Sequence, residues 1–285
     1  MNKFKFKKQL GQNFLTDEET LFNIATMSEI SNDDFVLEIG PGNGKLTEKL
    51  LPYPKAICLV EIDRELIPIL SDKFSSYKNI CIIHDDFLNM DFNKIIDEFI
   101  KFGFDKNKDK IKVVANLPYY ITGPIIFSLL ENDLISEIVI MVQKEVADRL
   151  VSPPNSRDYG VITVITNYFG KVKKLFNVPK EYFYPKPKVD SAVIKIDKYS
   201  YSYISEKYNN TDYNYLKSIV KTSFQQRRKT LVNSLSNQLN IDKSIIKTII
   251  ISMFNDENIR PENLSLEDYI ELSSKLSGLA SSPIQ

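Results

Sequence analysis

The sequence predicts an α/β fold: a mostly parallel sheet of seven strands with helices on both faces, followed by a small all-α domain. Short apolar runs alternate with segments of helical period over the first two thirds of the chain, a pattern typical of a parallel sheet. A glycine-rich turn directly follows the first apolar run, where backbone can approach a ligand closely. Beyond about residue 213 only helical period remains. We therefore expect two domains, residues 1–200 and residues 201–285.

The strands are predicted from apolar runs that are too short for helices and that stop at turn residues. Phe35–Ile39, for example, ends at glycines, as a buried strand does. An aromatic and proline-rich loop, Tyr182–Pro187, separates the last two runs. The seven predicted strands are residues 35–39, 56–60, 80–83, 111–115, 138–142, 172–178 and 189–196.

The helices are predicted from apolar residues that share one helical face, and from start and stop signals. Thr16, followed by acidic residues, reads as the N-cap of the first helix, and Pro52 ends the second. A stretch rich in Tyr, Ser, Asn and Asp, residues 199–213, is predicted to link the domains, and the tail after Ser277 is predicted to fray. The predicted helices are residues 16–27, 45–51, 64–74, 95–100, 124–130 and 161–168, then 216–224, 231–235, 245–253 and 266–276.

The composition is that of an ordinary globular protein, with 43% hydrophobic and 26% charged residues. No apolar run reaches the roughly 18 residues of a membrane span, and the charged N-terminus lacks the apolar core of a secretory signal. Cys58 and Cys81 lie in apolar runs, which predicts buried reduced thiols. One histidine and two cysteines leave few ligands for zinc. We expect a cytoplasmic protein without membrane contact and without a metal.

Charge is balanced overall but unevenly placed along the chain. The 37 basic and 37 acidic residues give zero net charge, which argues weakly against nucleic acid as a partner. Binding of a polyanion depends on local charge rather than on net charge, however, and the basic residues are clustered. Each cluster taken alone is better explained as a solvated face. The clusters are Lys3, Lys5, Lys7 and Lys8, then Lys171, Lys173, Lys174, Lys180, Lys186 and Lys188, and finally Arg227, Arg228 and Lys229.

The glycine-rich turn has the spacing G-x-G-x-G, at Gly40, Gly42 and Gly44. Such a turn brings backbone close to a ligand and directs helix N–H groups at it. Dinucleotide-binding enzymes use the same device with the spacing G-x-G-x-x-G, and Lys45 stands at the third position of that pattern. The spacing here resembles the S-adenosylmethionine loop of Rossmann-like methyltransferases.

Two acidic residues at the following strand ends complete a predicted donor site. Glu61 ends the second strand about twenty residues after Gly40, where a carboxylate accepts hydrogen bonds from both ribose hydroxyls. Asp86 follows the third strand and offers an acceptor for an adenine amino group beside the ring of Phe87. We prefer Asp86 to Asp85 because the sequence after Asp86 repeats the pattern of such methyltransferases.

The motif after the fourth strand, Asn116-Leu117-Pro118-Tyr119, predicts a site for an exocyclic amine of a base. The lone pair of such an amine is delocalised into the ring, so its methylation needs positioned acceptors rather than a strong base. The Asn116 side-chain oxygen and the Leu117 or Pro118 carbonyl are predicted to hold both N–H groups, and Tyr119 to stack on the ring. Phe183 is a candidate second aromatic wall, with a core phenylalanine as the alternative. A base in structured nucleic acid has to be flipped out to enter.

These residues make the chain resemble the small-subunit ribosomal RNA adenine N6,N6-dimethyltransferases, the family named for kasugamycin sensitivity, over nearly the whole length. One position departs from the family pattern, because Val232 stands where a basic residue is expected. The resembling stretches are Lys8–Leu15, Val36–Gly44, Glu61–Asp63, Asn116–Thr122, Gln143–Leu150, Tyr184–Val193 and Phe224–Leu231.

The resemblance implies a class I methyltransferase sheet whose last strand is antiparallel, with S-adenosylmethionine as methyl donor and no metal. Residues 1–200 would form the methyltransferase domain and residues 201–285 a helical RNA-binding domain. The implied donor contacts are Asn13, Leu15, Gly40, Glu61, Asp86 and Asn116, and the implied target-base contacts are Asn116, Tyr119 and Phe183.

The implied substrate is small-subunit (16S) rRNA within an immature 30S particle. Two adjacent adenosines in the loop of its terminal helix would each be methylated twice, giving N6,N6-dimethyladenosine during subunit biogenesis. We expect a monomer, because no heptad seam is present in the sequence.

Other functions share parts of these motifs. An erythromycin-resistance type enzyme, which dimethylates an adenosine of large-subunit rRNA, has the same donor loop. Three stretches favour the small-subunit family instead: Gln143–Leu150, Val189–Ser191 and Gln226–Lys229. A protein glutamine methyltransferase would have proline in place of Leu117, and the C-terminal helices do not suggest a DNA adenine methyltransferase. From another class, a non-catalytic assembly factor on the same scaffold would bind RNA without methyl transfer.

Overall fold

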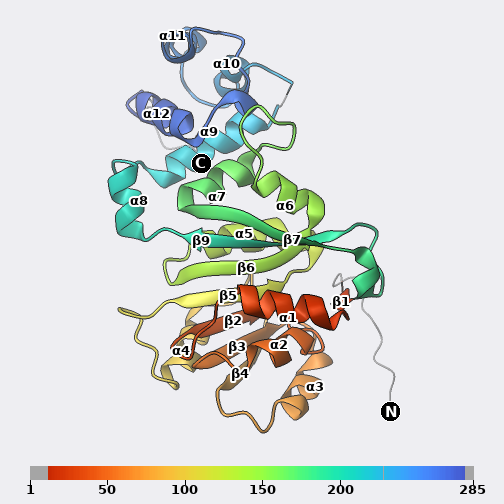
Figure 1. Cartoon of the computed structure of the whole chain (residues 1–285). Helices are drawn as coiled ribbons and strands as arrows, with labels where there is room; N and C mark the ends of the chain where they lie inside the picture. The colour runs from red at the N-terminus through yellow and green to blue at the C-terminus, as the bar shows by residue number, and fades with distance from the viewer. Residues whose placement is uncertain (1–11, 227, 280–285) are drawn as a thin grey trace. The chain divides into compact units, whose positions relative to one another are not determined.

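The computed structural model describes residues 12–226 and 228–279, which belong to two compact units (Figure 1). The first unit comprises the residues up to Ala147 together with Lys171–Lys198, and the second comprises Asp148–Gly170 and the residues from Tyr199 onward. The expected boundary at residue 200 lies near the division at 198/199, but residues 148–170 belong to the second unit. The aromatic residues at the end of helix α7 (Val161–Phe169) account for this, because Tyr168 stacks on Tyr208 with 5.0 Å between ring centroids.

The first unit contains a seven-stranded sheet in the order β4-β3-β2-β5-β6-β9-β7. The strands from β4 to β6 are parallel neighbours, and β9 runs antiparallel to β6. The predicted seven-stranded, mostly parallel sheet is therefore confirmed. Its strands are β2 (Phe35–Ile39), β3 (Ala56–Glu61), β4 (Ile80–His84), β5 (Ile111–Asn116), β6 (Ile135–Gln143), β7 (Gly170–Val178) and β9 (Ser191–Lys198).

Helices cover both faces of this sheet, which is why its central strands are apolar on both sides. Val36 belongs to the core beneath α1, α2 and α3, whereas Phe35 packs on the other face against Phe99 of α4, with 5.3 Å between ring centroids. Figure 1 shows α1 in front of the sheet and α5 behind it. The helices are α1 (Glu18–Met27), α2 (Lys45–Leu50), α3 (Leu66–Lys73), α4 (Asn93–Ile100), α5 (Thr122–Leu130) and α6 (Lys144–Leu150), the last of which was not predicted.

The N-terminal segment corrects one prediction and adds two strands. Asp17, not Thr16, caps α1: its carboxylate accepts the Thr20 backbone N–H at 2.8 Å. The Thr16 hydroxyl instead donates to the Tyr182 carbonyl, also at 2.8 Å. Two-residue strands β1 (Phe14–Leu15) and β8 (Phe183–Tyr184) pair antiparallel beside this contact. The segment before α1 is thus tied to the loop before β9.

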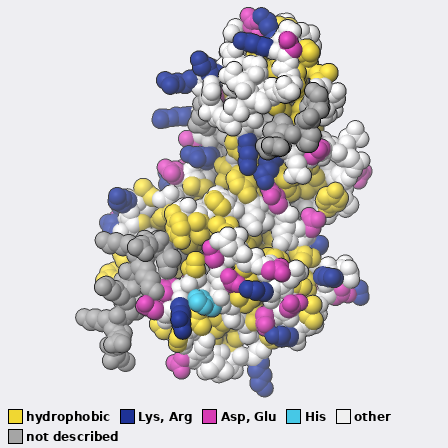
Figure 2. All heavy atoms as spheres, turned by 180° about the vertical axis from the view of Figure 1, so that it is seen from behind, with side chains coloured by type: hydrophobic (Ala, Val, Ile, Leu, Met, Phe, Trp, Pro, Cys, Tyr) yellow, Lys and Arg dark blue, Asp and Glu magenta, His cyan; other side chains and the backbone are white. Residues whose placement is uncertain are grey.

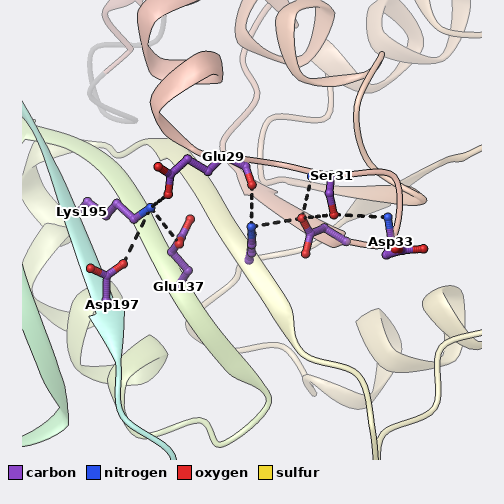
Figure 3. A network of polar contacts seen from close by, with 8 residues as sticks. Glu29, Ser31, Asp33, Glu137, Lys195 and Asp197 are labelled. Atoms are coloured by element: carbon purple, nitrogen blue, oxygen red, sulfur yellow. Dashed lines mark hydrogen bonds and ion pairs between the residues drawn. The ribbon is translucent and has the colours of Figure 1, made fainter.

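A network of ion pairs holds the other end of α1 against the amino ends of the parallel strands (Figure 3). The Lys195 ammonium of β9 lies 2.5 Å from a Glu29 carboxylate oxygen and 3.0 Å from one of Glu137. Lys112 of β5 pairs with Asp34 at 3.1 Å and donates to the Glu29 carbonyl. This network lies at the amino ends of the parallel strands. The predicted site residues lie at the opposite edge, at the carboxyl ends.

The second unit is helical, as predicted, with one element that the sequence did not indicate. Part of the expected linker forms α8 (Tyr201–Lys207), capped by the Ser200 hydroxyl and anchored by buried Ile204. Val232 is only 4% exposed, so the expected basic residue there would be buried. No helix of the described residues is long and apolar enough to cross a membrane. The remaining helices are α9 (Tyr213–Phe224), α10 (Leu231–Ser236), α11 (Lys243–Phe254) and α12 (Leu266–Ser277).

Candidate active site

The glycine-rich turn leaves β2 in a backbone conformation that suits glycine. Gly40 and Gly42 have φ of +67° and +59°, in the left-handed region. A Cβ on Gly42 would lie 2.5 Å from the Phe14 ring, so the turn also accommodates a close approach of the N-terminal segment. The Gly40 N–H donates to the Val60 carbonyl at 2.9 Å, which joins the ends of β2 and β3.

Glu61 at the end of β3 is buried and holds the turn in place. One carboxylate oxygen accepts the Gly42 N–H at 3.1 Å and the other accepts the Asp63 N–H at 2.8 Å. Burial raises the pKa of Glu61. An ionised carboxylate offers about four lone-pair positions. The two backbone bonds therefore leave acceptor capacity for the two hydroxyls of a ribose.

The two aspartates after β4 have different surroundings. Asp85 forms an ion pair with Lys94 at 2.5 Å, and the hydrogen bond from Lys94 lowers the pKa of Asp85. The Asp86 carboxylate accepts hydrogen bonds from the Leu88 N–H and the Asn89 side chain instead. Asp85 is already neutralised by a lysine, which supports the choice of Asp86 as acceptor for an adenine amino group.

These strand ends surround an open cavity of about 780 Å³, and a smaller one of about 340 Å³ adjoins it. Phe14, Gly40 and Asn116 line both cavities. Asn13, Glu61, Asp86, Phe87 and Tyr119 line the larger one, and Leu15, Glu38 and Lys45 line the smaller. The two cavities meeting at Asn116 suit an elongated ligand whose reactive centre lies beside that side chain.

Asn116, the last residue of β5, has its side-chain amide oriented by the N-terminal segment. The amide nitrogen donates to the Asn13 carbonyl, with 3.3 Å between Nδ2 and O. The amide oxygen is thereby left as the acceptor. The Pro118 carbonyl already accepts the Ile121 N–H at 3.3 Å and the Thr122 hydroxyl at 3.1 Å. Of the two carbonyls considered as the second acceptor, Leu117 is therefore favoured.

Tyr119 follows in a one-turn 3₁₀ helix (Tyr119–Ile121) and is half-buried at the larger cavity. Its hydroxyl shares a hydrogen bond with the Ser191 hydroxyl, with 2.7 Å between the oxygens. Burial raises the pKa of the phenol. The Tyr119 phenol is therefore neutral, and its ring lines the larger cavity without bringing a charge into it.

The structure brings all but one of the predicted site residues to these cavities. Phe183 is the exception: it lines neither cavity and is 4% exposed. It pairs with Leu15 across β1 and β8 and belongs to the core cluster of the unit. Its contact with a target base stays a prediction, and the alternative of a core phenylalanine describes its surroundings better.

Three further residues at the site were not predicted. Glu38 is 1% exposed and accepts the Thr47 hydroxyl at 2.7 Å, and burial raises its pKa to about 8. A lone acid in the otherwise apolar run Phe35–Ile39 is the signal that would have revealed it. Tyr120 is 56% exposed at the larger cavity, and Gln12 donates to Asp63 at 2.7 Å. Both of the last two lie in stretches that resemble the family, Lys8–Leu15 and Asn116–Thr122, and this position is the signal that could have indicated them.

The described residues contain no group of three or more His, Cys, Asp or Glu side chains that could hold a metal ion. The absence of a metal from the reaction stays a prediction.

The family model described as ribosomal RNA adenine dimethylase matches residues 3–276. A protein from Clostridium botulinum (strain Okra / Type B1), "Ribosomal RNA small subunit methyltransferase A", is 44% identical over 271 residues, which cover 95% of this chain and 94% of that protein. A protein of the same name from Bacillus mycoides (strain KBAB4) is 41% identical over 277 residues, covering 96% and 92%.

Two solved structures share the fold over most of their length. A dimethyladenosine transferase from Plasmodium falciparum has a TM-score of 0.75 and 26% identity, with 93% of this chain and 98% of that chain covered. The 23S rRNA methyltransferase ErmE has a TM-score of 0.64 and 25% identity, with 93% and 99% covered.

Proposed function

The chain belongs to the ribosomal RNA adenine dimethylase family, and on that premise we propose how its site works and which adenosines it modifies. The activity is the transfer of methyl groups from S-adenosylmethionine to adenine N6 in small-subunit rRNA. The two relatives named for the small subunit are 44% and 41% identical to the chain, against 25% for the 23S rRNA enzyme ErmE. The large-subunit alternative is correspondingly less supported, and the complete set of acids and amide at the cavity argues against a non-catalytic factor.

The observation that carries the proposal is the position of Asn116, which lines both cavities and has its amide oriented by the Asn13 carbonyl. On the donor side, Glu61 holds the ribose hydroxyls, Asp86 holds the adenine amino group, and the turn at Gly40 admits the ligand close to backbone. Asn13 and Leu15 complete the donor contacts. S-adenosylmethionine, when bound, supplies a methyl group on a positively charged sulfur.

On the acceptor side, the Asn116 amide oxygen and the Leu117 carbonyl accept the two N6–H groups of adenine. Holding both hydrogens favours a more pyramidal nitrogen, whose lone pair then points toward the donor methyl. Tyr119 stacks on the ring and keeps the base in the pocket, and Phe183 is retained as a candidate second wall. The proton leaves to solvent after transfer, so no strong base is required of the chain.

We further propose that the targets are two adjacent adenosines in the terminal helix loop of 16S rRNA within an immature 30S particle, modified in the cytoplasm by a monomer. The helical unit would grip RNA. The predicted basic residues Lys3, Lys5, Lys7, Lys8 and Arg227 lie outside the described residues. On the face shown in Figure 2, basic and acidic side chains are interspersed over the sheet unit. In the 171–188 region, Lys173 and Lys186 are paired with Asp197 and Glu181, so phosphate contacts are sought at individual lysines there.

The proposal is tested by incubating the purified protein with labelled S-adenosylmethionine and small subunits that lack the modification, followed by mapping of the labelled nucleotides. Label in two adjacent adenosines near the 3′ end, recovered as N6,N6-dimethyladenosine, is the expected result. Label on a different nucleotide of the small subunit would overturn the choice of adenosines, and label on large-subunit RNA alone would restore the resistance-type alternative. Donor binding without any transfer would favour an assembly factor.

A further inference from the structure

Four chain segments are joined into a closed ring by hydrogen bonds beside the larger cavity. Asn116 donates to the Asn13 carbonyl, and three residues later along the N-terminal segment Thr16 donates to the Tyr182 carbonyl. The Lys180 N–H donates to the Asp190 carboxylate at 3.1 Å. The adjacent Ser191 hydroxyl meets that of Tyr119 at 2.7 Å, and Tyr119 leads back to Asn116. Asp190 and Ser191 are adjacent members of this ring, and neither has been given a role in the reaction.

Ser191 is the fixed partner in its contact with Tyr119. It is the first residue of β9, is 0% exposed, and is paired with Gln143 of the interior strand β6. The preceding carbonyl, of Asp190, accepts the Lys144 N–H at 3.0 Å. Tyr119, by contrast, is half-buried on a single 3₁₀ turn. The hydrogen bond to Ser191 therefore ties the Tyr119 side chain to the sheet, and it restrains the aromatic ring more than the short 3₁₀ turn alone would.

Asp190 acts on the opposite side of the ring of bonds. Its carboxylate holds the backbone at Lys180, where a 3₁₀ turn (Lys180–Tyr182) leads into β8. Tyr182 in this turn also accepts both the backbone N–H and the hydroxyl of Thr16. Two neighbouring residues thus fix two segments, one carrying Tyr119 and the other carrying Phe183.

We propose that Ser191 is a positioning residue for the acceptor adenine: its hydroxyl sets the orientation of the Tyr119 ring on which the base stacks, while Asp190 sets the segment opposite. This inference rests on the proposed function, in which Tyr119 contacts the target base. Ser191 itself lines neither cavity. It acts through Tyr119, and its loss impairs alignment of the amine rather than binding of the donor.

The test compares Ser191→Ala with Tyr119→Phe, which removes the same hydrogen bond from the other partner, and with the double variant. Each single change is expected to lower kcat with undermethylated small subunits by about three- to tenfold. Because one bond is lost in every case, the double variant should be no slower than either single variant. The dissociation constant for S-adenosylmethionine should stay within about twofold of wild type, since the donor contacts are unchanged.

Ser28→Ala is the matched control. Ser28 is also 0% exposed and its hydroxyl also forms a 2.7 Å bond, to the Ile24 carbonyl, away from the cavities. It should lose similar thermal stability and keep the wild-type kcat. Equal losses of kcat in Ser28→Ala and Ser191→Ala, or losses that multiply in the double variant, would mean that Ser191 is merely structural and would overturn the inference.

Tyr119→Ala separates this inference from the proposed function. A slow Tyr119→Ala together with wild-type rates for Ser191→Ala and Tyr119→Phe would overturn the role of Ser191 while leaving the acceptor site intact. A Tyr119→Ala protein with full activity would instead overturn the acceptor site on which the inference rests. If Ser191→Ala does not fold, Tyr119→Phe changes the more exposed partner of the same bond, and its kcat decides the question.

Discussion

The donor half and the acceptor half of the site meet at Asn116 but are held in place by different means. The donor half consists of backbone, buried Glu61 and half-buried Asp86 at consecutive strand ends, and Glu61 reaches Gly42 across 19 positions. The acceptor half depends on side-chain bonds between distant segments. The bond from Tyr119 to Ser191 spans 72 positions, and that from Asn116 to Asn13 spans 103.

This difference has a functional meaning. A small donor that diffuses in freely is suited to a site whose geometry is set by the sheet itself before the ligand arrives. A flipped base is delivered by a large RNA particle, so the acceptor half has to align a group whose position is constrained from outside. Changes in the donor half should therefore alter donor affinity, and changes in the acceptor half should alter the transfer rate.

Asn116→Ala is expected to give the largest difference between the change in transfer rate and the change in donor affinity. Removing the amide oxygen leaves one N6–H of the target without its acceptor, and kcat should fall by about 10²- to 10³-fold. Donor affinity, measured by calorimetry, should stay within about threefold, because Glu61 and Asp86 are unchanged. Asn116→Asp keeps an acceptor oxygen but loses donation to the Asn13 carbonyl, so its kcat should lie between that of wild type and that of Asn116→Ala. A normal rate in Asn116→Ala would show that the acceptor half has been misassigned.

The next largest effect is expected in the donor half, for Gly42→Ala. An alanine at φ +59° is strained by about 1–2 kcal/mol, and its Cβ would meet the Phe14 ring at 2.5 Å. Donor affinity should fall by about 30-fold, while kcat at saturating donor changes little. Gly123→Ala in α5 is the control, because nothing lies within 4 Å of its added Cβ. An unchanged donor affinity in Gly42→Ala would mean that the turn tolerates a side chain and does not set the donor half.

A smaller effect is expected for Glu61→Gln. Glutamine keeps one acceptor oxygen, but its NH₂ group must face either the Gly42 or the Asp63 N–H, two donors that Glu61 now satisfies. Donor affinity should weaken by about tenfold, again with a small change in kcat. Equal losses in donor affinity and kcat would contradict the distinction between the two halves, because a change in the donor half would then alter the transfer rate as well.

The halves also differ in how far the sequence reveals them. Gly40 and Glu61 directly follow apolar runs, and Asp86 comes three residues after one, so a strand followed by a turn predicts both their place and their neighbours. Local pattern does not reveal partners across the fold. The Thr16 hydroxyl binds a carbonyl 166 positions away, which leaves Asp17 to cap α1. The same limit applies to Ser191, whose partner lies in another segment.

Burial by distant residues explains the other differences. Phe183 is placed in a loop by its sequence neighbours, yet pairing with Leu15 carries it into the core. The expected linker contains no long apolar period, but Tyr208 after α8 becomes buried by stacking on Tyr168. In both cases packing by residues remote in sequence outweighs local propensity.

The smallest effect on function is expected from Glu38→Gln. This variant is also the most direct probe of how completely water is excluded from the donor half. Burial raises the pKa of Glu38 from 4.5 to about 8. Between these values the folded protein keeps a proton that the unfolded chain has released. The unfolded state therefore binds fewer protons, and the free energy of unfolding falls as pH rises through this window, levelling off above about pH 8.

Glutamine does not titrate and still accepts the Thr47 hydroxyl, so Glu38→Gln should lack this loss. The difference in unfolding free energy between variant and wild type should be small near pH 5 and grow to the order of 5 kcal/mol by pH 8.5, at about 1.4 kcal/mol per pH unit. Urea unfolding across that range measures it, with Glu19→Gln on the surface as control. A difference that does not change with pH would show that water reaches Glu38, and the donor half would then be no more rigidly enclosed than the acceptor half.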